Sequence, residues 1–272
     1  MSDEFTVRFD LSGRVAVVTG AASGLSQAIA VGFAEYGADV IAADINDEGL
    51  KTTIEQITAT GRKGLAVHCD ISKPEQVAEL FETVDNAFGR VDILVNGPYS
   101  FTRSKPEDLT LEEWNRAISV CLTGFFLCSQ AAGQRMIKQG NGGSIISIGS
   151  IGGVSALGRG NFVYSIAKSG VHQMTRELAT EWAQHKIRVN ALIPAQMQTP
   201  SVRAWLNNPK TDANLVEHLL KGIPMNRLGE AEDIVGPAVF LASDASAFVT
   251  GILLPVDGGN LAMNAGGSHT WF

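Results

Sequence analysis

The sequence predicts an α/β fold, in which a parallel β-sheet is covered by helices on both faces. Short runs of β-branched and other apolar residues alternate along the chain with longer amphipathic segments. These short runs are apolar throughout, as expected for parallel strands that are buried on both sides. The chain has 272 residues, of which 45% are hydrophobic and 18% charged, so we expect residues 1–272 to form one globular domain.

The expected elements follow this alternation in order. Strands are predicted at residues 14–19, 39–44, 64–69, 91–95, 144–148, 187–193 and 252–256. Helices are predicted from about residue 24 and at residues 46–60, 74–88, 111–139 and 161–184. Pro74 would open the third of these helices, with Ser72 as its N-terminal cap.

Two segments depart from the pattern. Residues 195–227 contain Pro200, Pro209 and Pro224 and show no regular period, so we expect them to form a substrate lid. Residues 260–272 form a tail that ends in Trp271 and Phe272. Because two exposed aromatic rings at a chain end are unfavourable, we expect the tail to dock on the folded body, close to the lid of a neighbouring subunit.

Composition argues against several classes of protein. The net charge of −7 provides no broad basic face for a nucleic acid. The acidic N-terminus is not followed by the apolar core of a signal peptide, and no apolar run approaches the length of a membrane span. The three cysteines lack CxxC spacing and no histidines pair at ligand spacing, so neither disulfides nor a metal site is expected. We therefore expect a cytoplasmic protein that acts on a small molecule.

A glycine-rich turn, TGAASGLS at residues 19–26, separates the first predicted strand from the first helix. Glycines at this point let the backbone approach a pyrophosphate at the helix N-terminus. The spacing differs from the commoner Gly-x-Gly-x-x-Gly fingerprint, and by itself it is also compatible with a turn that binds nothing. As a dinucleotide site, it would contact the cofactor through Gly20, Ser23, Gly24 and Leu25.

Asp44 ends the second predicted strand, about 20 residues beyond the turn. A carboxylate there accepts hydrogen bonds from the adenosine ribose and repels the 2′-phosphate of NADP. No Lys or Arg lies within residues 21–25 or directly after Asp44 to offset that repulsion. The sequence therefore predicts NAD as cofactor, the alternative being a solvated carboxylate at a strand end.

Tyr164 and Lys168 stand four residues apart in a predicted helix, on one face. A tyrosine hydroxyl ionises near pH 10, and a nearby ammonium favours the phenolate. Ser150 directly follows the fifth predicted strand, at the carboxyl edge where such sheets bind ligands. Its hydroxyl would hold a substrate oxygen beside Tyr164. A Tyr-x-x-x-Lys pair alone is common by chance.

Together these motifs resemble those of the short-chain dehydrogenase/reductase (SDR) family. The resemblance covers about residues 11–259. It rests on TGAASGLS at Thr19, Asp44, CDIS at Cys69, LVNG at Leu94, SIISIGS at Ser144, YSIAK at Tyr164, RVNALIPA at Arg188 and VDGG at Val256. The resemblance implies a single Rossmann-like, doubly wound parallel sheet of about seven strands, a homotetramer, and hydride transfer between a secondary alcohol or ketone and a nicotinamide.

The resemblance also assigns roles to residues. Tyr164 would be the general acid/base, Lys168 would lower the pKa of that tyrosine and bind the nicotinamide ribose, and Ser150 would orient the reacting oxygen. The other cofactor contacts that it implies are Asp70 and Ile71 beside the adenine, Asn96 by the adenosine ribose, and Pro194 and Thr199 along the nicotinamide.

Three departures from the family pattern stand out. The third turn glycine is Ser26, and the usual Asn-Asn-Ala-Gly reads Asn96-Gly97-Pro98-Tyr99. Cys121 replaces an asparagine that, in the family, bends its helix and holds a proton-relay water. A thiol is a poor substitute for an amide. The departures keep open an alternative function, a catalytically weakened dinucleotide-binding sensor or scaffold.

The substrate is expected to be a polyol, sugar or sugar acid, because the lid begins with the polar run Gln196-Met197-Gln198. A solvated or packing role is the alternative for each candidate substrate residue. These candidates are Arg159, Asn161, Gln196 and Trp205, with Arg103 and Arg203 as further possibilities.

Overall fold

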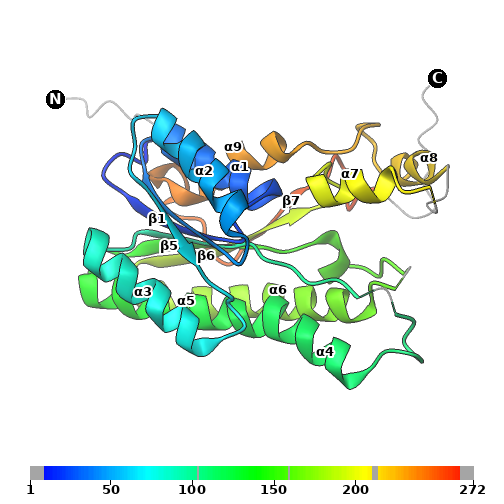
Figure 1. Ribbon diagram of the computed structural model, residues 1–272, viewed down its shortest axis with the longest axis horizontal. Helices are drawn as coiled ribbons and strands as arrows, with labels where there is room; N and C mark the ends of the chain where they lie inside the picture. Colours follow the sequence, from blue (N-terminus) through cyan, green and yellow to red (C-terminus); the bar gives the residue numbers. More distant parts are fainter. Residues whose placement is uncertain (1–8, 103, 159, 210–213, 264–272) are drawn as a thin grey trace.

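The computed structural model of the chain describes residues 9–102, 104–158, 160–209 and 214–263 (Figure 1). Seven parallel strands form one sheet in the order β3-β2-β1-β4-β5-β6-β7, which confirms the expected doubly wound architecture. The strands are β1 (Val15–Thr19), β2 (Asp39–Asp44), β3 (Gly64–His68), β4 (Ile93–Asn96), β5 (Gly143–Ile148), β6 (Ile187–Pro194) and β7 (Leu253–Val256). The chain order reverses between β1 and β4, where sheets of this kind bind ligands.

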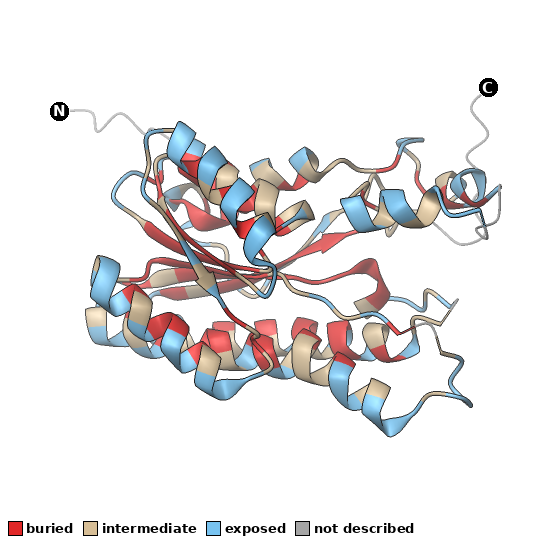
Figure 2. Ribbon diagram, viewed as in Figure 1, coloured by how far each residue is buried: buried red, intermediate tan, exposed pale blue. Residues whose placement is uncertain are grey.

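Helices cover both faces of the sheet (Figure 1). One face carries α1 (Gly24–Glu35), α2 (Asp47–Ala59) and α9 (Val235–Ala242). The other face carries α3 (Pro74–Phe88), α5 (Gly124–Gln139) and α6 (Phe162–Trp182). Figure 2 shows the strands and the inward faces of these helices as buried, so each face of the sheet has its own apolar core.

The long helix predicted at residues 111–139 is divided. It consists of α4 (Leu111–Ile118), a π-helical turn (Ser119–Thr123) that contains Cys121, and α5. By length and composition the whole segment qualifies as a candidate membrane span, contrary to our expectation that none would. Its side chains Phe125, Cys128 and Met136 are completely buried in the core of this domain.

Two local expectations are corrected. Ser72 does not cap α3: its hydroxyl donates to Asp70, and the helix begins after Lys73 without a side-chain cap. The segment 195–227 is less irregular than expected, because it contains α7 (Pro200–Leu206) and α8 (Leu215–Leu220). Leu215, Leu219, Ile223 and Leu228 give this segment a small core of its own, against which Trp205 packs.

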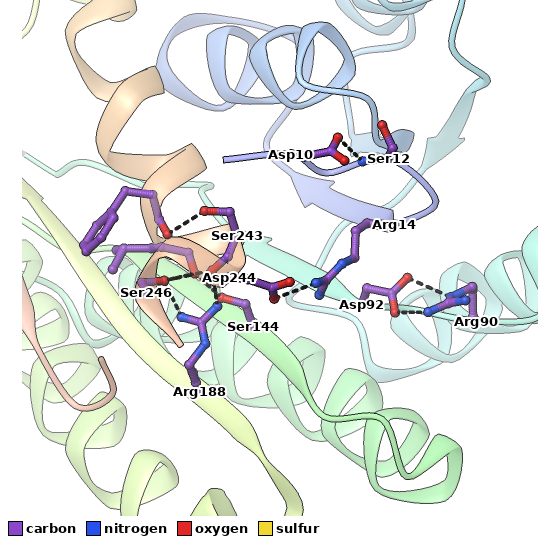
Figure 3. A network of polar contacts seen from close by, with 12 residues as sticks. Asp10, Ser12, Arg14, Arg90, Asp92, Ser144, Arg188, Ser243, Asp244 and Ser246 are labelled. Carbon is purple, nitrogen blue, oxygen red and sulfur yellow. Dashed lines mark hydrogen bonds and ion pairs between the residues drawn. The ribbon is translucent and has the colours of Figure 1, made fainter. Parts of the chain in front are cut away.

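A polar network ties together the opposite edge of the sheet, where the strands begin (Figure 3). The Arg188 guanidinium donates to Ser246 Oγ at 2.8 Å and to the Ser243 carbonyl oxygen at 3.1 Å. Burial lowers the pKa of Arg188 to about 10. Nearby, Arg14 pairs with Asp244 at 2.7 Å, but the Asp244 side chain is 65% exposed. The first interaction is therefore largely shielded from water, and the second is not.

We predict that Arg188→Met lowers the free energy of unfolding by about 2–4 kcal/mol, because two hydrogen bonds from a charged group are lost. The matched variant Arg14→Met should lower it by less than about 1 kcal/mol, since exposed ion pairs contribute little. Urea denaturation of both variants measures the two effects. Equal destabilisation by the two substitutions would contradict this account of the edge.

Candidate active site

A cavity of about 630 Å³ opens at the carboxyl edge of the sheet, and it joins the glycine turn to the face of α6. Its walls come from the turn, from residues directly after the strands, and from α6 and α7. Most of the residues predicted from the sequence line it. They are Gly20, Ser23, Gly24, Leu25, Asp44, Asp70, Ile71, Ser150, Asn161, Tyr164, Lys168, Pro194, Gln196, Thr199 and Trp205.

The glycine turn leaves no room for side chains. Gly20 and Gly24 both have positive φ, +70° and +61°. A Cβ at Gly20 would lie 2.8 Å from the Pro98 nitrogen, and one at Gly24 would lie 3.2 Å from Thr199 Cγ2. Pro98 and Thr199 therefore pack directly over the turn, and the exposed backbone at the start of α1 suits a pyrophosphate.

The departure at Ser26 is matched by the departure at Gly97. Ser26 is 3% exposed, and a Cβ at Gly97 would overlap its hydroxyl oxygen. The same Cβ would lie 2.7 Å from the Thr19 carbonyl oxygen. The serine thus occupies space that the glycine leaves free, so the turn keeps its shape although both family positions have changed.

Asp44 presents its carboxylate to the cavity in a fixed orientation. One oxygen accepts a hydrogen bond from the Ala22 amide at 3.1 Å, and the other accepts one from the Asn46 amide at 3.0 Å. These contacts tie the end of β2 to the glycine turn. Among the described residues that line the cavity, the cations are Arg116 and Lys168.

Asn96, which we expected by the adenosine ribose, has its side chain turned away from the cavity. Its side chain is completely buried and donates to Ser129 Oγ at 3.0 Å and to Ser147 Oγ at 3.4 Å. Asn96 does not line the cavity, whereas Gly97 does. The side chain of this last residue of β4 therefore points into the protein, where its amide supports the sheet.

Lys168 is a buried amine at the centre of the site. It is 1% exposed, and its Nζ donates to the Ile148 carbonyl oxygen at 2.6 Å. The amine also lies 4.6 Å from the centroid of the Phe125 ring, which stabilises a cation. Burial lowers the pKa of Lys168 to about 8. The ammonium therefore remains the main form at neutral pH.

Tyr164 lies one helical turn before Lys168, with the amine 5.7 Å from its ring centroid. We expected the ammonium to lower the pKa of this tyrosine. In the chain alone, burial raises the pKa, and a hydrogen bond with Ser150 opposes that shift without reversing it. Desolvation of the phenolate outweighs the favourable contacts, so the cofactor-free chain holds Tyr164 as a neutral phenol.

His172, one turn beyond Lys168 on α6, supports the turn that carries Ser150. The Ser150 amide points to His172 Nε2 at 3.5 Å, and a Cβ on either Gly149 or Gly153 would collide with the imidazole. Burial, followed by the nearby Lys168 charge, lowers the pKa of His172 to about 4. A neutral imidazole keeps Nε2 as an acceptor, so the geometry around Ser150 persists at neutral pH.

Cys121 holds the backbone of the loop that follows β4. Its buried sulfur accepts a hydrogen bond from the Ser100 amide at 3.1 Å and lies 3.7 Å from the Ser100 carbonyl oxygen, to which the thiol donates. A thiol thus serves both backbone groups of one residue. The helix is still locally widened at this point, into the π-helical turn.

The candidate substrate residues divide into three groups. Gln196, Asn161 and Trp205 line the cavity, and Gln196 Oε1 is buried without a hydrogen-bond partner. Arg203 is paired with Glu230 at 2.8 Å and is not among the lining residues. Arg103, Arg159 and the tail from residue 264 lie outside the described residues.

The structure also reveals cavity residues that sequence reasoning missed. Residues 97–110 follow β4 without a periodic pattern, so their side chains could not be assigned to a face. Those that line the cavity and were not expected there include Tyr99, Ser100, Phe101, Arg116 and Ser201.

Known proteins resemble this chain over nearly its whole length. A family model described as enoyl-(acyl carrier protein) reductase matches residues 20–260. The 2-dehydro-3-deoxy-D-gluconate 5-dehydrogenase of Dickeya dadantii is 39% identical over 258 residues, which cover 93% of this chain and 98% of that protein. The D-threitol dehydrogenase of Mycolicibacterium smegmatis is 37% identical, over 95% of this chain and 97% of that protein.

A solved structure from Beutenbergia cavernae agrees with these relatives. It is provisionally named an NAD(P)-dependent gluconate 5-dehydrogenase, contains NADP at low occupancy, and superposes with a TM-score of 0.87 at 38% identity. The superposition covers 94% of this chain and 99% of that one. With its seven-stranded parallel sheet and this shared sequence, the chain belongs to the short-chain dehydrogenase/reductase family.

Proposed function

We propose that this protein is an NAD-dependent oxidoreductase that interconverts a secondary alcohol and a ketone on a sugar acid or polyol. The observation that carries the proposal is the convergence of Ser150, Tyr164 and Lys168 in the cavity that also contains the glycine turn. An acid/base group and a dinucleotide-shaped turn in one cavity fit hydride transfer better than binding alone. The related dehydrogenases of sugar acids and polyols support the same reaction class.

Each residue of the site has a distinct part in this reaction. The Ser150 hydroxyl and Tyr164 Oη hold the substrate hydroxyl. In its phenolate form Tyr164 takes the proton of that hydroxyl, while the hydrogen on the adjacent carbon leaves as hydride. The Lys168 ammonium favours the phenolate that accepts this proton, and in the reverse reaction it stabilises the phenolate left when Tyr164 gives its proton to a ketone. When bound, a nicotinamide cofactor supplies the carbon that accepts the hydride and a positive charge. The bare backbone at Gly20 and Gly24 and the oriented Asp44 carboxylate fit such a group.

The cavity also has groups that suit a hydroxylated, acidic substrate. Gln196 lines its wall with an amide whose buried Oε1 has no hydrogen-bond partner, and a rotation of this side chain would offer the amide to a substrate hydroxyl. Arg116 adds a cation at the wall, suited to a carboxylate. The relatives do not decide between NAD and NADP, because one of them is named an L-rhamnose 1-dehydrogenase (NAD(P)(+)). The proposed preference for NAD therefore rests on the Asp44 carboxylate.

A panel of sugar acids, polyols and the corresponding ketones, each mixed with NAD or NADH, tests the proposal through absorbance of the reduced cofactor. We expect turnover with at least one compound of the panel. Tight NAD binding, measured by calorimetry, without turnover of any compound would instead support a sensor or scaffold.

We predict that Tyr164→Phe lowers kcat/KM at least about 1000-fold, because the proton-transfer hydroxyl is lost. The dissociation constant of NAD should stay within about threefold of wild type, because the ring remains in place. Tyr36→Phe, which removes an exposed hydroxyl at the end of α1, serves as the matched control and should retain activity. Substantial turnover by Tyr164→Phe would rule out the assigned role.

We predict that Asp44→Asn narrows the kcat/KM preference for NAD over NADP by about tenfold, equivalent to about 1.4 kcal/mol, because repulsion of the 2′-phosphate is removed. Asp39→Asn removes a carboxylate from the other end of the same strand and should leave the ratio unchanged. If the wild-type chain used NAD and NADP with equal kcat/KM, Asp44 would not determine which cofactor is preferred.

We predict that Cys121→Ser keeps activity within about fivefold of wild type, because a hydroxyl can serve the same two Ser100 backbone groups. Cys121→Ala removes both contacts and should lower kcat and the melting temperature together. Complete inactivity of a folded serine variant would reveal a specific need for sulfur.

A further inference from the structure

Three aromatic rings form a continuous chain along one wall of the cavity. The Tyr99 and Phe101 centroids lie 5.2 Å apart in an edge-on arrangement, and Phe101 lies 4.4 Å from Tyr164. At the other end, the Tyr99 hydroxyl is hydrogen-bonded to the hydroxyl of Ser201, in the first turn of α7. The loop after β4 therefore connects the acid/base residue on α6 to the lid helix.

Burial does not account for these two rings. Tyr99 remains 48% exposed and Phe101 43% exposed, so neither is a core residue. Tyr99 also stands where the family usually has a glycine. A solvent-accessible tyrosine at such a position gains its ordering from ring packing and from the bond to Ser201.

The connection crosses directly above the cofactor turn. Pro98, next to Tyr99, packs on Gly20, and Thr199, two residues before Ser201, packs on Gly24. The two segments that touch the two turn glycines are thus the same two that the Tyr99–Ser201 bond joins. A dinucleotide with its pyrophosphate at this turn would therefore have both segments beside it.

We propose that Tyr99 and Phe101 act as an aromatic clasp, in which Tyr99 closes the cavity over the bound dinucleotide through Ser201 and Phe101 positions the Tyr164 ring for proton transfer. Tyr99 and Ser201 must part before the dinucleotide leaves. The Phe101 half of the clasp rests on the proposed role of Tyr164, whereas the Tyr99 half concerns cofactor release alone. Failure of the proposed reaction therefore leaves the Tyr99 half testable.

The first experiment is a double-mutant cycle read by stopped-flow release of NADH, which needs no substrate. Tyr99→Phe keeps the ring and removes its hydroxyl, and Ser201→Ala removes the partner. Each should raise the NADH dissociation rate about three- to tenfold, and the double variant should release NADH no faster than either single variant. Tyr36→Phe is the control and should match wild type. Unchanged rates, or single effects that multiply in the double variant, would overturn the clasp.

The second experiment separates positioning from general packing. Phe101→Leu keeps an apolar side chain without the stacked ring, and it should lower kcat about fivefold or more while NADH release is no faster than in Tyr99→Phe. Phe101→Tyr retains the ring and should restore kcat to within about twofold. A wild-type kcat in the leucine variant, or failure of the tyrosine variant to restore it, would refute the role of Phe101.

Discussion

The buried amine of Lys168 is the constraint on which the arrangement of the site depends. An ammonium that is 1% exposed needs an acceptor, and it finds the Ile148 carbonyl oxygen at the end of β5 and the face of the Phe125 ring. These contacts fix the rotation of α6 against the sheet. Tyr164 and His172 lie one turn to either side, so the same rotation aims the phenol into the cavity and the imidazole under Ser150.

The sheet, its helices and most of the cavity residues could be predicted because they follow local rules. Apolar runs indicate parallel strands, and the residues that directly follow those strands meet at one edge. The loop after β4 could not be predicted in the same way. Tyr99 and Phe101 acquire their partners only through tertiary packing. The Asn96 side chain points inward because the hydroxyls of Ser129 and Ser147 accept hydrogen bonds from its amide nitrogen.

Departures from the family pattern make physical sense in pairs. Ser26 fits because Gly97 lacks a side chain, and Cys121 fits because both backbone groups of Ser100 face its sulfur. Neither pairing is visible from one position alone, which is why the sequence left a weakened binding protein open. The pKa of Tyr164 could not be predicted from the sequence either. Helix spacing places the Lys168 ammonium near the phenol, but burial decides in which direction the pKa shifts.

The central claim is that burial keeps Tyr164 protonated in the chain alone, and that the charge of a bound nicotinamide completes the proposed acid/base site. Ultraviolet difference titration of wild type against Tyr164→Phe isolates this hydroxyl among the three tyrosines of the chain. The account predicts that, without cofactor, the Tyr164 phenolate is absent at pH 10, about the ordinary tyrosine pKa, and that NAD moves its appearance to lower pH. Ionisation of Tyr164 at or below that pH in the cofactor-free chain would contradict the account.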